Sequence, residues 1–158
     1  MIPFVRRADG LHLGMSSGER SVLASLVEQL QQVLEGDLAA DPVSARMFPE
    51  AYPGDAEASA EFAKYTRSDL LAQKTTNAGT VHAWLTGARD GALTAEDEQA
   101  WLRALTDLRL TIAERLGIVD AASEEASYTG DAGVGLRDVY DWVGYVQEHL
   151  VTSLTSQR

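Results

Sequence analysis

The clearest pattern of hydrophobic and polar positions lies between residues 16 and 36. Ser16 and Glu19 have the spacing of a capping box, in which each side chain bonds the backbone N–H group of the other residue at the start of a helix. The apolar positions that follow are Val22, Leu23, Leu26, Val27, Leu30, Val33 and Leu34. Their spacing of three and four residues predicts an amphipathic helix, and Gly36 stands where such a helix ends.

Two more apolar stripes with helical spacing follow in the second half of the chain. One begins after Thr94, a helix-capping residue type, and ends at Gly117. The other covers about residues 137–154. The apolar positions are Trp101, Leu102, Leu105, Leu108, Ile112 and Leu116 in the first stripe, and Val139, Trp142, Val143, Val146, Leu150 and Leu154 in the second. We expect both stripes to face the core of the protein.

The pattern is less regular between these helices. Residues 37–54 hold three of the four prolines, which predicts a loop. A short helix over about 55–65 and a longer one over about 67–87 should follow, the second ending at Gly87. The apolar anchors expected to pack the loop down are Met47, Phe48 and Tyr52, and the inward positions of the longer helix are Leu70, Leu71, Ala78, Val81, Trp84 and Leu85.

The N-terminal residues predict a β-hairpin, because two short β-prone runs flank the turn pair Asp9-Gly10. The fold class is therefore mainly α: a helical bundle of four main helices plus one short helix, with an N-terminal β-hairpin. We expect a single domain over 1–158, with a hairpin at 1–15, a helical core at 16–117 that includes the packed loop 37–54, a flexible acidic loop at 118–136 and a final helix at 137–154.

Composition narrows the function mainly by exclusion. The chain has no cysteine, so it forms no disulfide, thiolate metal site or cysteine nucleophile. It contains no run of about 20 apolar residues that would span a membrane. The N-terminus lacks the order of a secretory signal, because its two arginines follow the apolar residues. We therefore expect a cytoplasmic protein without membrane contact.

The net charge of −11 is unevenly spread. Residues 37–66 carry six acidic and two basic side chains, and residues 118–158 carry seven acidic and two basic ones. Only residues 67–93 have a net positive charge. Binding to nucleic acid requires a basic face, so this distribution disfavours DNA binding by a monomer. The two acidic stretches instead suit a basic protein partner.

The residues that commonly carry catalysis do not form a recognisable group. The histidines His12, His82 and His149 fall in separate predicted elements, without the spacing that places two metal ligands on one helix face. The glycine-rich stretch 130–135 lacks the preceding strand and the lysine of a phosphate-binding loop. No nucleophile-elbow motif occurs. We expect neither enzymatic activity nor a bound metal or cofactor.

Six polar residues interrupt the apolar stripes of the two middle helices and are the best candidate site. They are Arg67, Lys74, Asn77, Arg103, Asp107 and Arg109. If the two helices are neighbours, Asp107 will meet Lys74 or one of the arginines. One interpretation is a partly buried salt-bridge network that fixes the helix register. The other is an anion pocket or a partner-binding patch built on the four cations.

Three stretches of the chain resemble a known family. They are MFPEAYPGDAEASAEFAKYTRSDLLAQKTTNA (47–78), AWLRALTDLRLTIAERLGI (100–118) and VYDWVGYVQEHLV (139–151). They are similar to the actinobacterial domain-of-unknown-function family numbered twenty-seventeen, which is typically encoded beside the ClpS adaptor of the Clp protease. The resemblance implies a link to regulated proteolysis, and some relatives are described as transcriptional regulators. It supplies no catalytic residues.

The interpretation that we favour is a non-catalytic binding or regulatory module that acts through protein–protein contacts with an unknown partner. Two alternatives stay open. One is a transcriptional regulator that binds DNA as a dimer through Arg6, Arg7 and Arg20. The other is a small-anion-binding site between helices. A homodimer also stays open, because the edge of a hairpin invites strand pairing between chains.

Overall fold

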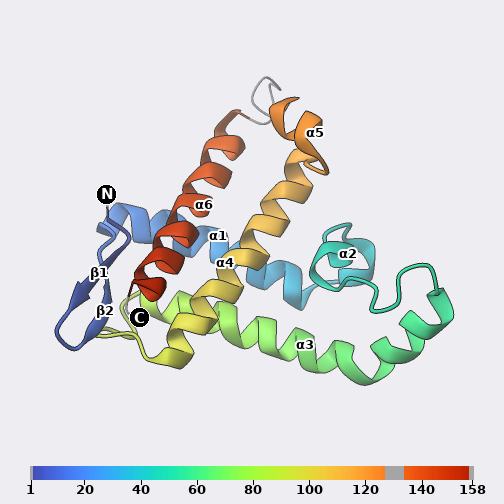
Figure 1. Cartoon of the computed structure of the whole chain (residues 1–158), viewed down its shortest axis with the longest axis horizontal. Helices are drawn as coiled ribbons and strands as arrows, with labels where there is room; N and C mark the ends of the chain where they lie inside the picture. Colours follow the sequence, from blue (N-terminus) through green and yellow to red (C-terminus); the bar gives the residue numbers. More distant parts are fainter. Residues whose placement is uncertain (1, 127–133, 157–158) are drawn as a thin grey trace.

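The computed structural model describes residues 2–126 and 134–156, in which a hairpin precedes a stack of helices (Figure 1). Strands β1 (Phe4–Arg7) and β2 (Gly10–Leu13) pair antiparallel. The helices are α1 (Ser17–Glu35), the 3-10 turn η1 (Leu38–Ala40), α2 (Ser44–Met47), α3 (Ala56–Leu85), α4 (Ala95–Leu116), α5 (Ala121–Ala126) and α6 (Val134–Thr155). A mainly helical fold with an N-terminal hairpin is therefore confirmed.

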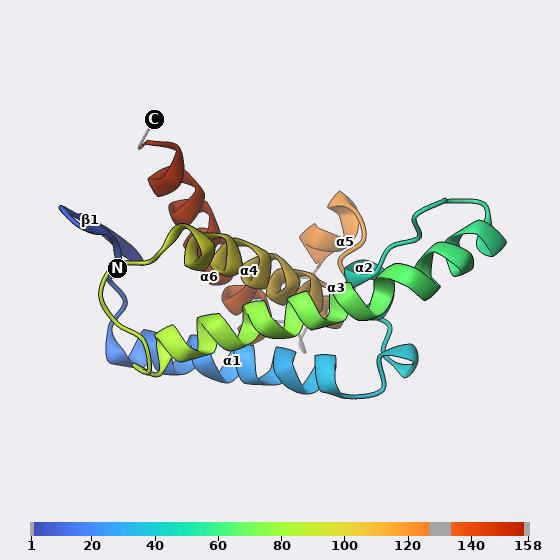
Figure 2. The same cartoon turned by 90° about the horizontal axis from the view of Figure 1, so that it is seen from below.

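Helix α4 lies at the centre of the stack, between α3 and α6 (Figures 1 and 2). Helix α1 packs on α3, and β1 lies against α6. In the core, the fully buried ring of Trp101 meets Phe4 edge-on, with 5.4 Å between the ring centroids. Phe4 also stacks on His149 of α6 at 6.3 Å. A single aromatic side chain thus attaches the hairpin to both α4 and α6.

The helix starts that the sequence predicted are formed by reciprocal capping bonds. The Glu19 backbone N–H donates to Ser16 Oγ at 3.2 Å, and the Ser16 N–H donates to Glu19 Oε1 at 2.9 Å. The bond from the Ser16 backbone N–H lowers the pKa of the Glu19 carboxyl. Thr94 and Asp97 make the same pair of bonds at the start of α4. Each cap satisfies backbone donors that a helix start otherwise leaves free.

Helix α3 corrects the prediction of two helices over 55–65 and 67–87, because residues 56–85 form one continuous helix. The apolar stripe fades near residue 66, but no glycine or proline stands there to interrupt the helix. Thr66 lies within the helix and donates its hydroxyl to the Phe62 carbonyl. Although α3 is 30 residues long, neither it nor any other helix of the described residues has the length and apolar composition needed to cross a membrane.

The proline-containing segment before α3 is held against α4 by ion pairs as well as by apolar contacts. Leu38, Val43 and Met47 are buried. Arg115 of α4 donates two hydrogen bonds, of 2.9 and 3.1 Å, to the carboxylate of Asp41. That fork-like contact lowers the pKa of Asp41. Residues 49–54 are exposed, however, and Tyr52, which the sequence predicted as an anchor of the loop, is 52% exposed.

Residues 118–136, expected to form a flexible acidic loop, contain more helix than the sequence indicated. Helix α5 occupies part of this stretch, and α6 already begins at Val134 rather than near 137. Residues 127–133, and with them most of the glycine-rich stretch 130–135, lie outside the described residues.

Truncation of Phe4 tests the attachment of the hairpin. Because Phe4 is 2% exposed and contacts Trp101, Phe4→Ala should lower the free energy of unfolding by about 3–5 kcal/mol. Phe62→Ala provides a matched control, since Phe62 is 47% exposed. Urea denaturation followed by circular dichroism measures both variants. Equal losses for the two variants would contradict this account of the core.

Candidate functional site

The most deeply buried ion pair of the described residues connects α3 to α4. Lys74 Nζ lies 2.6 Å from Asp107 Oδ1, and the two side chains are 14% and 4% exposed. Burial raises the pKa of the Asp107 carboxyl above its ordinary value, and the hydrogen bond from Lys74 offsets part of that rise. Asp107 thus meets Lys74, one of the four cations that the sequence offered. Breaking such a pair would leave one buried charge without its partner, which favours the helix register in which Lys74 meets Asp107.

A cleft of about 330 Å³ opens beside this pair, between α3 and α4. Its lining residues are Leu70, Gln73, Lys74, Asn77, Leu102, Arg103, Thr106 and Asp107. Four of the six predicted site residues therefore share one cleft. The charge of Lys74 is matched by Asp107, while Arg103 is exposed and forms no ion pair within the described residues. The buried ion pair and the cleft therefore lie side by side. Arg103 is the cation of the cleft that could contact a ligand.

Arg67 does not line this cleft. Its guanidinium lies over the ring of Phe48, 4.7 Å from the centroid, and Lys74 Nζ lies 5.8 Å from the same centroid. The two cations therefore approach an aromatic side chain of the segment that precedes α3. Such cation–π contacts hold that segment against the helix.

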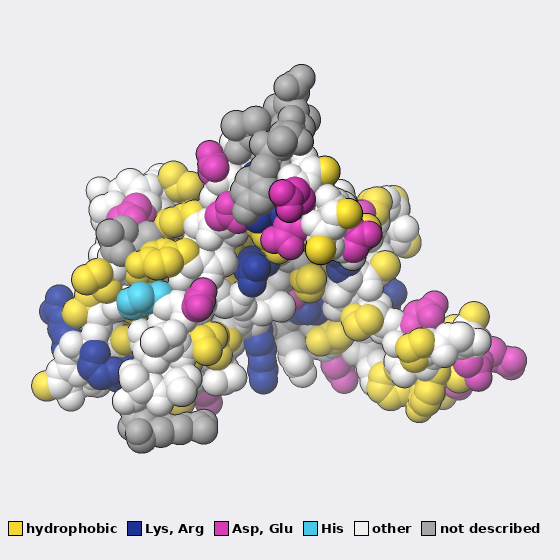
Figure 3. Space-filling model, turned by 45° about the horizontal axis from the view of Figure 1, so that its top comes forward, with side chains coloured by type: hydrophobic (Ala, Val, Ile, Leu, Met, Phe, Trp, Pro, Cys, Tyr) yellow, Lys and Arg dark blue, Asp and Glu magenta, His cyan; other side chains and the backbone are white. Residues whose placement is uncertain are grey.

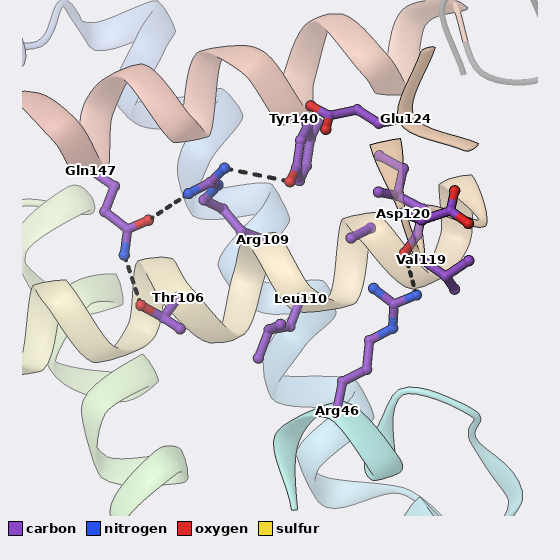
Figure 4. A pocket seen from close by; sticks show the side chains of 11 residues that line it. Arg46, Thr106, Arg109, Leu110, Val119, Asp120, Glu124, Tyr140 and Gln147 are labelled. Atoms are coloured by element: carbon purple, nitrogen blue, oxygen red, sulfur yellow. Dashed lines mark hydrogen bonds between the residues drawn. The ribbon is translucent and has the colours of Figure 1, made fainter. Parts of the chain in front are cut away.

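Arg109 faces the opposite side of α4, toward α6 (Figure 4). Its Nη1 donates to Gln147 Oε1 at 3.1 Å, and its Nη2 donates to the Tyr140 hydroxyl at 3.4 Å. Gln147 in turn donates its amide N–H to Thr106 Oγ1 at 2.7 Å. A second pocket, of about 340 Å³, lies at this group. The six predicted residues thus occupy three separate places instead of one.

The polar partners of Arg109 were missed by sequence reasoning, although their spacing carries a signal. Tyr140 and Gln147 are seven residues apart and share one face of α6, as Thr106 and Arg109 share one face of α4. Each of these residues is ordinary on its own helix. Only the contact between α4 and α6 makes them a group.

The histidines take no part in either pocket. His12 lies 2.7 Å from Asp9, and His82 lies 2.9 Å from Glu28. His149 packs between the rings of Phe4 and Tyr145. Within residues 2–126 and 134–156, no group of three or more metal-binding side chain types comes together.

The Asp107→Asn variant tests the balance of burial and pairing at the α3–α4 contact. A raised pKa means that the folded protein keeps the Asp107 proton at pH values where the unfolded chain has lost it. Stability of the wild type relative to Asp107→Asn should therefore fall as pH rises above the ordinary pKa of 3.8. Urea denaturation at a series of pH values measures the difference. Asp69→Asn, on an exposed position of α3, controls for the loss of one charge. If the stability of the wild type relative to Asp107→Asn rises with pH instead, the attraction to Lys74 outweighs the cost of burying the Asp107 charge.

Comparison with known proteins identifies the family but not an activity. No curated protein and no solved structure matches the chain significantly. A family model, by contrast, matches residues 1–154, which is nearly the whole chain and includes both pockets. The chain belongs to the family described as "Domain of unknown function (DUF2017)".

Proposed function

We propose that the protein is a non-catalytic binding module and that it contacts a protein partner through the outer part of α3. The observation that carries this proposal is a group of exposed aromatic side chains. Tyr65 is 73% exposed, Tyr52 is 52% exposed and Phe62 is 47% exposed. We call residues 50–66 the aromatic arm. Aromatic residues are enriched at protein interfaces, where their burial contributes much of the binding energy.

The aromatic arm projects from the helical stack yet has a defined local structure (Figures 1 and 2). The rings of Tyr52 and Phe62 meet edge-on, with 6.1 Å between centroids. Ser59 Oγ donates to the Tyr52 carbonyl at 2.9 Å and accepts from the Tyr52 N–H at 3.2 Å. Asp55 caps the helix by accepting the Ala58 N–H at 3.0 Å. These contacts order the surface before a partner binds, which lowers the entropic cost of binding.

The charge of the aromatic arm favours a basic partner. Glu50, Asp55, Glu57 and Glu61 are all exposed there, and the arm's lysine, Lys64, already pairs with Glu61 at 3.1 Å. Figure 3 shows hydrophobic and acidic side chains gathered on this projection. A partner segment with basic and apolar side chains is complementary to this surface, and its association should weaken in salt.

Regulated proteolysis supplies the first partners to test. The family resemblance implies that the gene for this protein lies beside the gene for the ClpS adaptor. We therefore include a role linked to Clp-dependent proteolysis in the proposal. DNA binding by a dimer has less support. Arg20 donates to the carbonyl oxygens of Met15 and Leu13, and Arg6 donates to that of Ser153. These contacts with the protein's own backbone compete with contacts to phosphates.

Substitution of the aromatic arm tests the proposal. The tagged protein is used to capture purified ClpS and the Clp subunits, and then native lysate, at low and high salt. The double variant Phe62→Ala/Tyr65→Ala should weaken capture of a partner by at least about tenfold, because buried aromatic anchors dominate such interfaces. The control Val22→Ala/Val151→Ala removes two side chains that are 50% and 47% exposed elsewhere, and it should bind as the wild type does.

Two results would contradict the proposal. One is the recovery of no partner at either salt concentration. The other is a partner that both double variants retain equally. Circular dichroism of each variant confirms that the helices are intact, and exposed positions such as Tyr65 leave the core unchanged.

A further inference from the structure

Arg109 carries a half-buried positive charge that no carboxylate of the described residues neutralises. Other arginines around it are paired: Arg46 with Glu114, Arg115 with Asp41, and Arg137 with Glu124 and Asp141. The contacts of Arg109 are instead two neutral side chains, Gln147 and Tyr140. A guanidinium that has lost water without gaining a counter-ion raises the free energy of the folded state, and a bound anion would remove that cost.

The guanidinium still has N–H groups to offer. Of its five N–H groups, two donate to Gln147 and Tyr140, and its buried Nε atom has no partner within the structure described. The Gln147 amide nitrogen donates to Thr106 and to the Leu102 carbonyl, which turns its oxygen toward Arg109. Because the Tyr140 hydroxyl accepts from Arg109, its own proton is available to a ligand oxygen. Arg109 and the Tyr140 hydroxyl therefore supply the hydrogen-bond donors that line one end of the pocket.

The pocket at this position has a polar end and an apolar wall. Its volume of about 340 Å³ is that of a small-molecule site. Arg109, Gln147, Thr106 and Tyr140 form the polar end, as the close-up shows (Figure 4). The apolar wall consists of Leu110, Ala113, Ile118 and Val119. This arrangement fits a ligand with one anionic group and an apolar body.

From this geometry we propose that Arg109 anchors a binding site between α4 and α6 for a small monocarboxylate with an aliphatic or aromatic body. A planar carboxylate matches the fork of N–H groups on a guanidinium. Arg46, which is paired with Glu114, also lines the pocket, and so do the carboxylates of Asp120 and Glu124. Their negative charges repel a phosphate dianion more strongly than a monoanion, which favours the carboxylate.

Hexanoate and benzoate are suitable probes, with hexanamide and benzamide as neutral analogues and inorganic phosphate as the dianion. Binding is followed through the side-chain Nε–H resonance of Arg109 and through the melting temperature. For ligands of this size we expect a Kd on the order of 1 mM for at least one carboxylate. The amides and phosphate should bind at least about tenfold more weakly, because they lack the single matched charge.

Three variants assign the binding to this pocket. Arg109→Gln should abolish the melting shift with the carboxylate. Tyr140→Phe keeps the ring but removes the hydroxyl, so it should weaken binding by about three- to tenfold. Arg103→Gln, which removes the exposed cation of the cleft between α3 and α4, should leave binding unchanged. Tyr140→Phe keeps the test decisive if Arg109→Gln fails to fold.

The proposal is overturned if neither carboxylate shifts the Arg109 Nε–H resonance, or if phosphate binds as tightly as the carboxylates do. It is equally overturned if Arg103→Gln abolishes binding while Tyr140→Phe leaves it intact.

Discussion

The arrangement of this protein depends on the burial of helix α4 on more than one side. Its buried residues include Trp101 and Leu105, but also the polar Asp107 and Thr111. An amphipathic helix at a protein surface buries one stripe, whereas α4 buries enough of its circumference to require α3 and α6 as neighbours. The polar residues on its flanks must then find partners on those helices, because a buried polar group without a partner destabilises the fold.

The two flanks of α4 meet this requirement in different ways. Toward α3, Asp107 forms an ion pair with Lys74, so the two charges neutralise each other. Toward α6, Arg109 finds a glutamine and a tyrosine, which satisfy hydrogen bonds but leave the charge unmatched. The first contact is typical of a structural ion pair. We propose the second as a binding site, because a bound anion would supply the negative charge that the protein's own side chains do not place there.

The outer part of α3 owes its structure to local interactions instead of burial. The Asp55 cap and the Glu61–Lys64 pair support a helix that projects from the stack. Tyr65 is therefore an exposed aromatic side chain on an ordered helix, outside the core. The pocket at Arg109 lies on another part of the molecule, between α4 and α6, so the two proposed sites rest on independent observations.

The sequence by itself determined where α1, α3 and α4 begin, which faces the long helices bury and that the fold is mainly α, because capping and periodicity act within a few residues. It placed the hairpin and the caps at Ser16 and Thr94 correctly, but the two-residue turn is Ala8-Asp9, and Gly10, predicted in the turn, already pairs with Arg7. It divided α3 wrongly, since a fading apolar stripe marks the limit of the core and not the end of a helix. Only the tertiary structure decided that Lys74 takes Asp107 and that Arg109 turns to Tyr140 and Gln147. Periodicity assigns a residue to a face of its helix, but the neighbour on that face is chosen by the packing of the whole chain.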